Sequence, residues 1–265
     1  MKLNIVPART GIQWVKLGVQ TFLKQPLALA GLFFMYMAAV LVLSQIPVIG
    51  PVLGGVLVPA ATLGLMAATA EATKGRFPMP SVLISAFRAG KQQARAMLVL
   101  GVLYTVGSLL ASLVGGLLTG AAAPAPATAD AQVPELGGRE MLVLLLHTPL
   151  IILFWHAPAL VHWHGVSPVK SLFFSGVACL RNFGAMLMYG VTWIAVFLVV
   201  GFLLSTLGMV FGGVAVARSI MMPTVLLLVA MFSTSMYFTF RDSFVADVPP
   251  EPQPLPAEAG GDDQP

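Results

Sequence analysis

The chain has 265 residues, of which 58% are hydrophobic and only 9% are charged. A soluble domain carries about a quarter of its residues charged, so this composition excludes a soluble globule and indicates a membrane protein. The formal net charge is +4, and the lone cysteine, Cys179, excludes an intramolecular disulfide and a multi-cysteine metal site.

Six apolar stretches without a charged residue are each long enough to cross a bilayer. An α-helix needs roughly 17–25 residues to span about 30 Å of hydrocarbon. Because lipid offers the backbone no hydrogen-bond partner, helices satisfy it internally. The stretches are residues 27–46, 52–70, 97–118, 141–161, 184–207 and 219–240. The sequence therefore predicts an all-α, polytopic membrane protein with six transmembrane helices.

A short segment of mixed polarity, introduced by proline, precedes the first, third and fifth stretches. Each segment ends in a basic residue followed by an amide; these pairs are Lys24-Gln25, Lys91-Gln92 and Arg181-Asn182. Any cytoplasmic linker at a lipid surface tends to be basic and amphipathic, which is the alternative explanation. That alternative does not readily place the pair at the same point three times. We predict three repeats of an interfacial amphipathic helix plus a two-span hairpin, at about residues 7–70, 78–161 and 167–240.

Two of these segments have a clear amphipathic pattern. Basic residues in residues 81–96 are spaced to share one helical face, and residues 168–183 combine an apolar stripe with a basic side. Helices of this kind lie in the membrane interface. The pattern is weaker in the first segment, where Trp14 is expected to anchor the helix at the interface. The side chains predicted to contact lipid head groups are Arg88, Lys91, Arg95, Lys170 and Arg181.

The basic residues predict the orientation. With a cytoplasmic N-terminus, all fourteen except Arg139 and Arg218 lie on the cytoplasmic side, as the positive-inside rule requires. Both termini are then cytoplasmic, and the loop 121–140 is periplasmic. A basic membrane face favours anionic lipids, and nothing calls for nucleic acid. The membrane domain is expected over residues 1–244, and the acidic, proline-rich tail 245–265 is expected to be disordered.

The densest group of candidate ligands is His156, His162 and His164. At 100° per residue, a continuous helix cannot aim all three at one metal, although a break near Pro158 would change that. We interpret the segment as a span end, where the flanking tryptophans form an interfacial belt and the histidines face head groups. The sequence contains no catalytic or phosphate-binding motif of a known kind. We therefore expect no cofactor and no metal, and leave the role of the three histidines open.

The spans themselves contain few polar groups. His147 and His156 are their titratable side chains, and the lack of Asp, Glu, Lys and Arg counts against an ion-driven transporter. Serines in the spans are interpreted as packing or helix-bending residues. Gly50 and Gly54 permit close helix packing within one chain, with a homo-oligomer or a membrane-protein partner as the alternative.

The segments MKLNIVPARTGIQWVKLGVQTFLKQPLALAGLFFMYM, FPMPSVLISAFRAGKQQARAMLVLG, FWHAPALVHWHGVSPVKSLFFSGVACLRNFGAM and YFTFRDSF resemble recurring blocks of a family of six-span proteobacterial inner-membrane proteins. The resemblance covers roughly residues 1–244. More distantly, residues 157–183 are similar to the membrane domains attached to some bacterial glycerophosphodiester phosphodiesterases. This chain lacks their soluble catalytic domain, so the resemblance implies a fold and the bacterial inner membrane, and no reaction.

Three functional hypotheses follow. We favour a non-enzymatic inner-membrane protein whose basic interfacial helices contact anionic lipid or a partner in envelope organisation. A permease for a small neutral or amphipathic solute is the alternative, and it requires a polar-lined cavity at mid-membrane. A membrane-embedded enzyme would require the three histidines to converge on one point.

Overall fold

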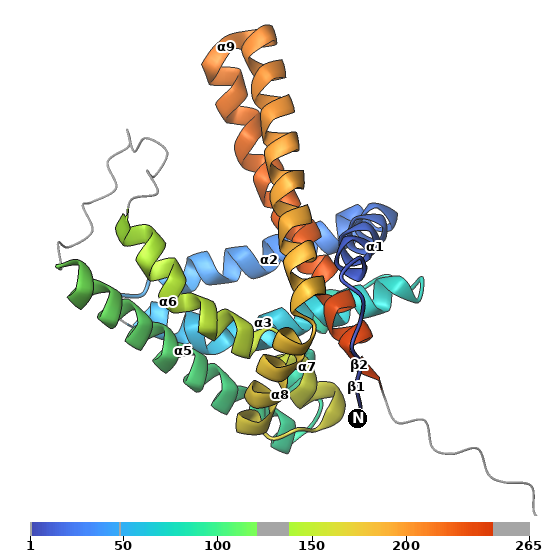
Figure 1. Ribbon diagram of the computed structural model, residues 1–265, viewed down its shortest axis with the longest axis vertical. Helices are drawn as coiled ribbons and strands as arrows, with labels where there is room; N and C mark the ends of the chain where they lie inside the picture. Colours follow the sequence, from blue (N-terminus) through green and yellow to red (C-terminus); the bar gives the residue numbers. More distant parts are fainter. Residues whose placement is uncertain (1, 48, 121–137, 246–265) are drawn as a thin grey trace, which may run out of the picture.

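The computed structural model describes residues 2–47, 49–120 and 138–245, and nearly all of them are helical (Figure 1). The predicted disordered tail and most of the loop 121–140 lie outside these ranges. In chain order the elements are β1 (Lys2–Leu3), α1 (Thr10–Lys24), α2 (Pro26–Ser44), α3 (Ile49–Thr73), the 3₁₀ helix η1 (Pro80–Ile84), α4 (Ser85–Arg88), α5 (Lys91–Thr119), α6 (Gly138–Phe154), α7 (Ala157–His164), α8 (Pro168–Arg181), α9 (Phe183–Ser243) and β2 (Phe244–Val245).

Five segments of the described chain are long and apolar enough to cross a membrane: α2, α3, α5, residues 141–164 in α6 and α7, and α9. The prediction of an all-α polytopic membrane protein is confirmed. Helix α9 is much longer than a bilayer needs, and it folds back on itself. At Gly213 the backbone has φ 71° and ψ −164°, a conformation that glycine adopts without a steric penalty. Figure 1 shows the two arms of α9 side by side.

The helices form three hairpins whose tips point in different directions. Helix α2 pairs with α3, α5 with α6, and the first arm of α9 with the second. In Figure 1 the α9 hairpin is upright, whereas α2 and α3 run across the view. The tips are apolar and exposed; Leu117 and Phe211, for example, are 74% and 80% exposed. The hairpins are thus joined near their bases and present apolar side chains on most other faces.

The buried core lies at the bases of the hairpins. One cluster joins α3, α5 and α7 through residues such as Leu63, Leu100 and Val161. Helices α3 and α5 cross closely there, because a Cβ atom on Gly101 would overlap the Val56 carbonyl oxygen. A second cluster packs Trp14 of α1 against Ala185, Tyr189, Trp193 and Phe238 of α9. A third cluster joins α2, α3 and α9 through Leu32, Ala68 and Ala230, so the three hairpins are held together at one end.

The segment 81–96 is not one continuous helix, so that expectation is wrong. It consists of η1, the single turn α4, a break at Ala89 and Gly90, and the start of α5. Gly90 has φ 117°, which interrupts the helix. Arg88 therefore belongs to α4, whereas Lys91 and Arg95 belong to α5. The segment 168–183 does contain a helix, α8, which ends at Arg181, and its placement at the membrane interface stays a prediction.

The two ends of the described chain lie side by side. Strand β1 pairs with β2 in antiparallel register, with Lys2 opposite Val245 and Leu3 opposite Phe244. The short ribbon places the beginning of the chain against the end of α9.

Candidate functional site

The basic residues singled out in the sequence lie near the bases of the hairpins, and their side chains are exposed. They come from three elements: α4, the first turns of α5, and α8. In the described part of the chain, ion pairs join Arg76 to Glu71 and Arg241 to Asp242, and none involves this group. The exposed group is Arg88, Lys91, Arg95, Lys170 and Arg181. Their charge is therefore available to an anionic partner.

Helix α8 carries an apolar stripe that faces away from the protein. Val169, Phe173 and Leu180 are 69%, 64% and 67% exposed. The opposite side of the helix is small and polar, and Ser171 and Ser175 are fully buried there. The large apolar side chains of the predicted stripe therefore point away from the protein core. This face is suited to contact with lipid.

His156 is fully buried at the junction of α6, α7, α8 and α9, so the expectation that it faces head groups is wrong. Its Nε2 lies 3.2 Å from Thr239 Oγ1, and its backbone N–H donates to Ser175 Oγ at 3.0 Å. The Thr239 hydroxyl donates to the Met236 carbonyl, so it accepts from both His156 and Trp155 Nε1. The imidazole is therefore held as part of a hydrogen-bonded core.

Cys179 closes the other side of this cluster. Its Sγ lies 3.8 Å from His156 Nδ1 and 3.8 Å from the Ile152 carbonyl oxygen. Burial raises the pKa of the Cys179 thiol to about 12. The sulfur therefore stays protonated at neutral pH and packs as a small hydrophobic group.

The three histidines do not converge. His162 faces a hollow beside α4, and His164 lines a different hollow with Lys74 and Arg241. Within the described residues, no group of three His, Cys, Asp or Glu side chains could hold a metal ion. The convergence that the enzyme hypothesis requires is not observed among these side chains.

The predicted tryptophan belt is wrong for Trp155 but fits Trp163. The Trp155 indole packs edge-on against Tyr189 and Phe232 inside the protein. Trp163 is 36% exposed at the end of α7. Each of the two residues follows an apolar run, so both fit the pattern of a belt, whereas the break between α6 and α7 turns Trp155 inward.

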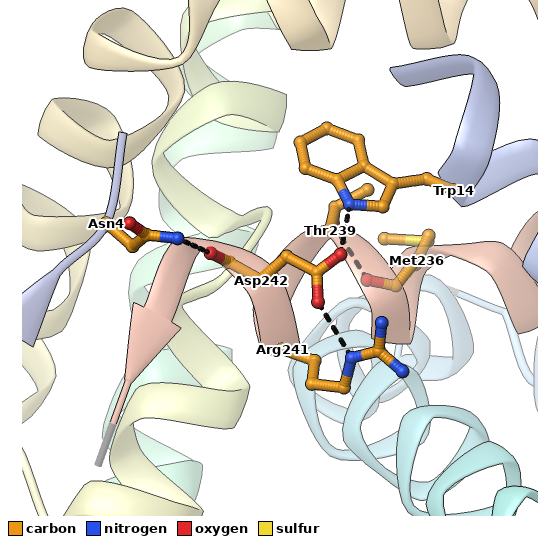
Figure 2. Close-up of polar contacts among 6 residues, drawn as sticks. All are labelled: Asn4, Trp14, Met236, Thr239, Arg241 and Asp242. Carbon is orange, nitrogen blue, oxygen red and sulfur yellow. Dashed lines mark hydrogen bonds and ion pairs between the residues drawn. The ribbon is translucent and has the colours of Figure 1, made fainter. Parts of the chain in front are cut away.

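Trp14 is buried as well, so it is not an interfacial anchor. Its Nε1–H donates to Asp242 Oδ2 at 2.9 Å, and Arg241 Nε donates to the other carboxylate oxygen at 2.8 Å. Figure 2 shows this arrangement, with Asn4 donating to the Asp242 carbonyl at 2.9 Å. The contact joins Trp14 of α1 to Asp242, which lies 228 positions later in the sequence. No local sequence pattern could reveal it.

Asn182 fastens the N-terminal segment from the other side. Its Oδ1 accepts from the Val6 N–H at 2.9 Å, and its Nδ2 donates to the Asn4 carbonyl at 3.0 Å and to Ser243 Oγ at 3.3 Å. The side chain is 2% exposed. The recurring basic-amide pair was the signal for this residue in the sequence. The structure shows that the amide of the third pair is a structural clamp.

A hollow of about 300 Å³ opens between α2, α3 and η1–α4. Its walls include Met35, Leu43, Leu57 and Phe87, and Tyr36 contributes the one phenol among its lining residues. A permease requires a polar-lined cavity at mid-membrane. This hollow is apolar, so it does not meet that requirement.

The exposed apolar hairpins, the buried polar junctions at their bases and the exposed cations define an integral, multi-pass helical membrane protein. Over 267 aligned residues the chain is 36% identical to a probable inner membrane protein of Burkholderia thailandensis, covering 96% of this chain and 97% of that protein. The chain belongs to the same family of inner-membrane proteins. No family model and no solved structure matches. The likeness to membrane domains of glycerophosphodiester phosphodiesterases stays a prediction.

Proposed function

We propose that this chain is a non-enzymatic inner-membrane protein whose basic cytoplasmic surface binds anionic lipid head groups and so contributes to envelope organisation. The observation that carries the proposal is the outward face of α8. Val169, Phe173 and Leu180 are exposed there, and the exposed Lys170 and Arg181 lie along one side of this stripe. An exposed apolar stripe flanked by cations is the pattern of a helix lying in the membrane interface.

The proposal includes six spans with both termini in the cytoplasm. The break at Gly213 divides α9 into two arms, each close to one bilayer in length. The pairing of β1 with β2 supports termini on the same side of the membrane. The distribution of lysine and arginine favours the cytoplasm as that side.

The proposal also includes the threefold repeat. Lys24 ends α1 and Gln25 separates it from α2; in the same way, Arg181 ends α8 and Asn182 separates it from α9. Lys91-Gln92 occupies the first turn of α5, directly after the break at Gly90. In each case the pair stands where a surface segment gives way to a long apolar helix. This common position supports three units of the same design.

The expected strength of the lipid contact follows from its charges. A basic side chain near an anionic leaflet contributes on the order of 1 kcal/mol, so five contribute several. Single substitutions should therefore have small effects. Replacing Arg95, Lys170 and Arg181 together by Gln should lower the ratio of phosphatidylglycerol to phosphatidylethanolamine in the purified protein. An unchanged ratio in a folded triple variant would contradict the proposal.

Cysteine labelling tests the orientation. In a Cys179→Ala background, Gly75→Cys between α3 and η1 should react only after the membrane is made permeable, and Ala127→Cys should react in intact spheroplasts. The opposite pattern would invert the topology.

The alternative stays a permease for a small neutral or amphipathic solute; the hollow between α2 and α3 has room for the apolar part of such a solute but lacks the polar lining that a permease requires. Solute flux into proteoliposomes that is lost on Ala60→Trp, which fills this hollow, would favour that function instead.

A further inference from the structure

The break at Ala89 and Gly90 leaves a recess in the surface beside the first turn of α5. A hollow of about 740 Å³ lies between the start of α5 and the α7–α8 connection. A smaller hollow of about 340 Å³ lies between η1–α4 and His162 of α7. Ala89 lines both. We call these two adjoining hollows the α4–α5 recess.

Two buried polar atoms in the recess have no hydrogen-bond partner. They are Ser85 Oγ and His162 Nδ1, and both residues line the smaller hollow together with Arg88. Almost all buried polar groups in proteins are paired, so an unpaired one calls for an explanation such as an absent ligand. Two such atoms, on residues that line one hollow from elements far apart in the sequence, indicate a place for a polar ligand.

The chemistry of the recess selects an anion. Arg88 contributes a guanidinium to one hollow and Lys91 an ammonium to the other, and Gln92 and Gln93 add amides. No carboxylate is present among the described lining residues of either hollow. The first backbone amides of α5 also open here, because the helix begins at Lys91 without a side-chain cap. The cationic side chains, the amides and the free backbone N–H groups of the recess therefore favour a ligand with several acceptor oxygens.

The position of the recess suits the phosphate layer of a membrane. Lys91 lies six residues before Met97, where the apolar part of α5 begins. At 1.5 Å per residue this is about 9 Å along the helix, so the recess stands just outside the hydrocarbon when α5 spans the bilayer.

We infer that the α4–α5 recess binds one phosphate group, with Arg88 and Lys91 as its cations and Ser85 and His162 as hydrogen-bond donors. The inference rests on the proposed function in that a phospholipid head group is the expected carrier of the phosphate. It goes further in assigning a single site of defined composition, whereas diffuse attraction to an anionic leaflet needs only surface charge.

Native mass spectrometry of the full chain in a non-ionic detergent tests the site. The wild type should retain one phosphatidylglycerol after delipidation. Arg88→Gln with Lys91→Gln, and separately Ser85→Ala with His162→Phe, should weaken its binding roughly tenfold or more, because each removes hydrogen bonds to a charged group. Lys16→Gln with Lys24→Gln removes the same charge from exposed positions on α1, and it should retain the lipid.

The second double variant leaves the number of lysines and arginines unchanged, so it separates a built site from surface charge. If Ser85→Ala with His162→Phe disturbs folding, lipid retention is instead compared between the wild type and Ser85→Ala alone, provided that the two have the same thermal stability. Retention of the lipid by both recess variants, or equal loss from all three double variants, would overturn the site. Equal loss would leave the proposed function standing, since it shows lipid binding by charge alone.

A second arm identifies the carrier of the phosphate. Delipidated wild type is titrated calorimetrically with glycerol 1-phosphate and with inorganic phosphate. If both soluble compounds bind at least tenfold more weakly than phosphatidylglycerol, the recess is assigned to a lipid. Tighter binding of the soluble compounds, lost in the recess variants, keeps the phosphate site but assigns it to a soluble ester. Failure of all three probes to bind would refute the inference.

Discussion

Replacing Asn182 by Ala should destabilise the protein more than any other single amide substitution near the surface. The side chain makes three hydrogen bonds, two of them to backbone groups of Asn4 and Val6. Removing the amide leaves the Asn4 carbonyl and the Val6 N–H without their hydrogen-bond partner. Each such loss costs about 1–3 kcal/mol, and we use the lower half of this range because water partly reaches residues 4–6. The expected loss is about 2–4 kcal/mol.

Thermal unfolding in detergent measures this loss. At roughly 2–4 °C per kcal/mol for a chain of this size, the Tm should fall by at least about 4 °C. Asn182→Asp keeps the shape but removes the donor and turns a carboxylate oxygen towards the Asn4 carbonyl, so it should destabilise the protein at least as much. Gln20→Ala, at an exposed position of α1, is the control. A Tm change below 2 °C for Asn182→Ala would refute the clamp.

Three further predictions concern single residues. Cys179 should react with a maleimide at pH 8 roughly 10³-fold more slowly in the folded protein than in SDS, because its thiol stays protonated below a pKa of about 12; complete labelling within minutes in mild detergent would contradict this. Gly101→Leu should abolish folded protein in size-exclusion chromatography because α3 and α5 can no longer cross at Val56, whereas Gly116→Leu, with open space around it, should be tolerated. Gly213→Val should lower the thermal stability, since φ 71° disfavours a β-branched side chain; an unchanged Tm would show that the turn adapts.

The long apolar helices could be predicted from the sequence because spanning a bilayer is a local property of length and hydropathy. The stretches 184–207 and 219–240 even bracket the turn at Gly213. The interruption of residues 81–96 was missed for a physical reason: a count of helical spacing takes no account of the backbone angle at Gly90. Arg88 and Lys91 are consequently brought to one recess by a break, and not by a shared helical face.

The buried junctions could not be predicted, because their partners are distant in the sequence. Trp14 and Asp242, or His156 and Thr239, give no periodic signal. An aromatic residue beside an apolar run fits a membrane interface and a protein core equally well, and Trp155 and Trp163 show both outcomes. The locations of the five basic residues were more predictable, since exposed cations need only water or an anion nearby.

The pairing of β1 with β2 has a consequence for biosynthesis. Trp14 and Asn4 gain their hydrogen bonds to Asp242 only when the second arm of α9 has been made. At 5–20 residues per second, translation from α1 to the end of α9 takes roughly 10–45 s. During this interval the earlier hairpins can insert, and α1 can already pack on α2, α3 and the first arm of α9. The second arm of α9 adds the remaining contacts, and a ribosome that stalls before residue 242 leaves a chain in which Trp14 and Asn4 lack their hydrogen bonds to Asp242.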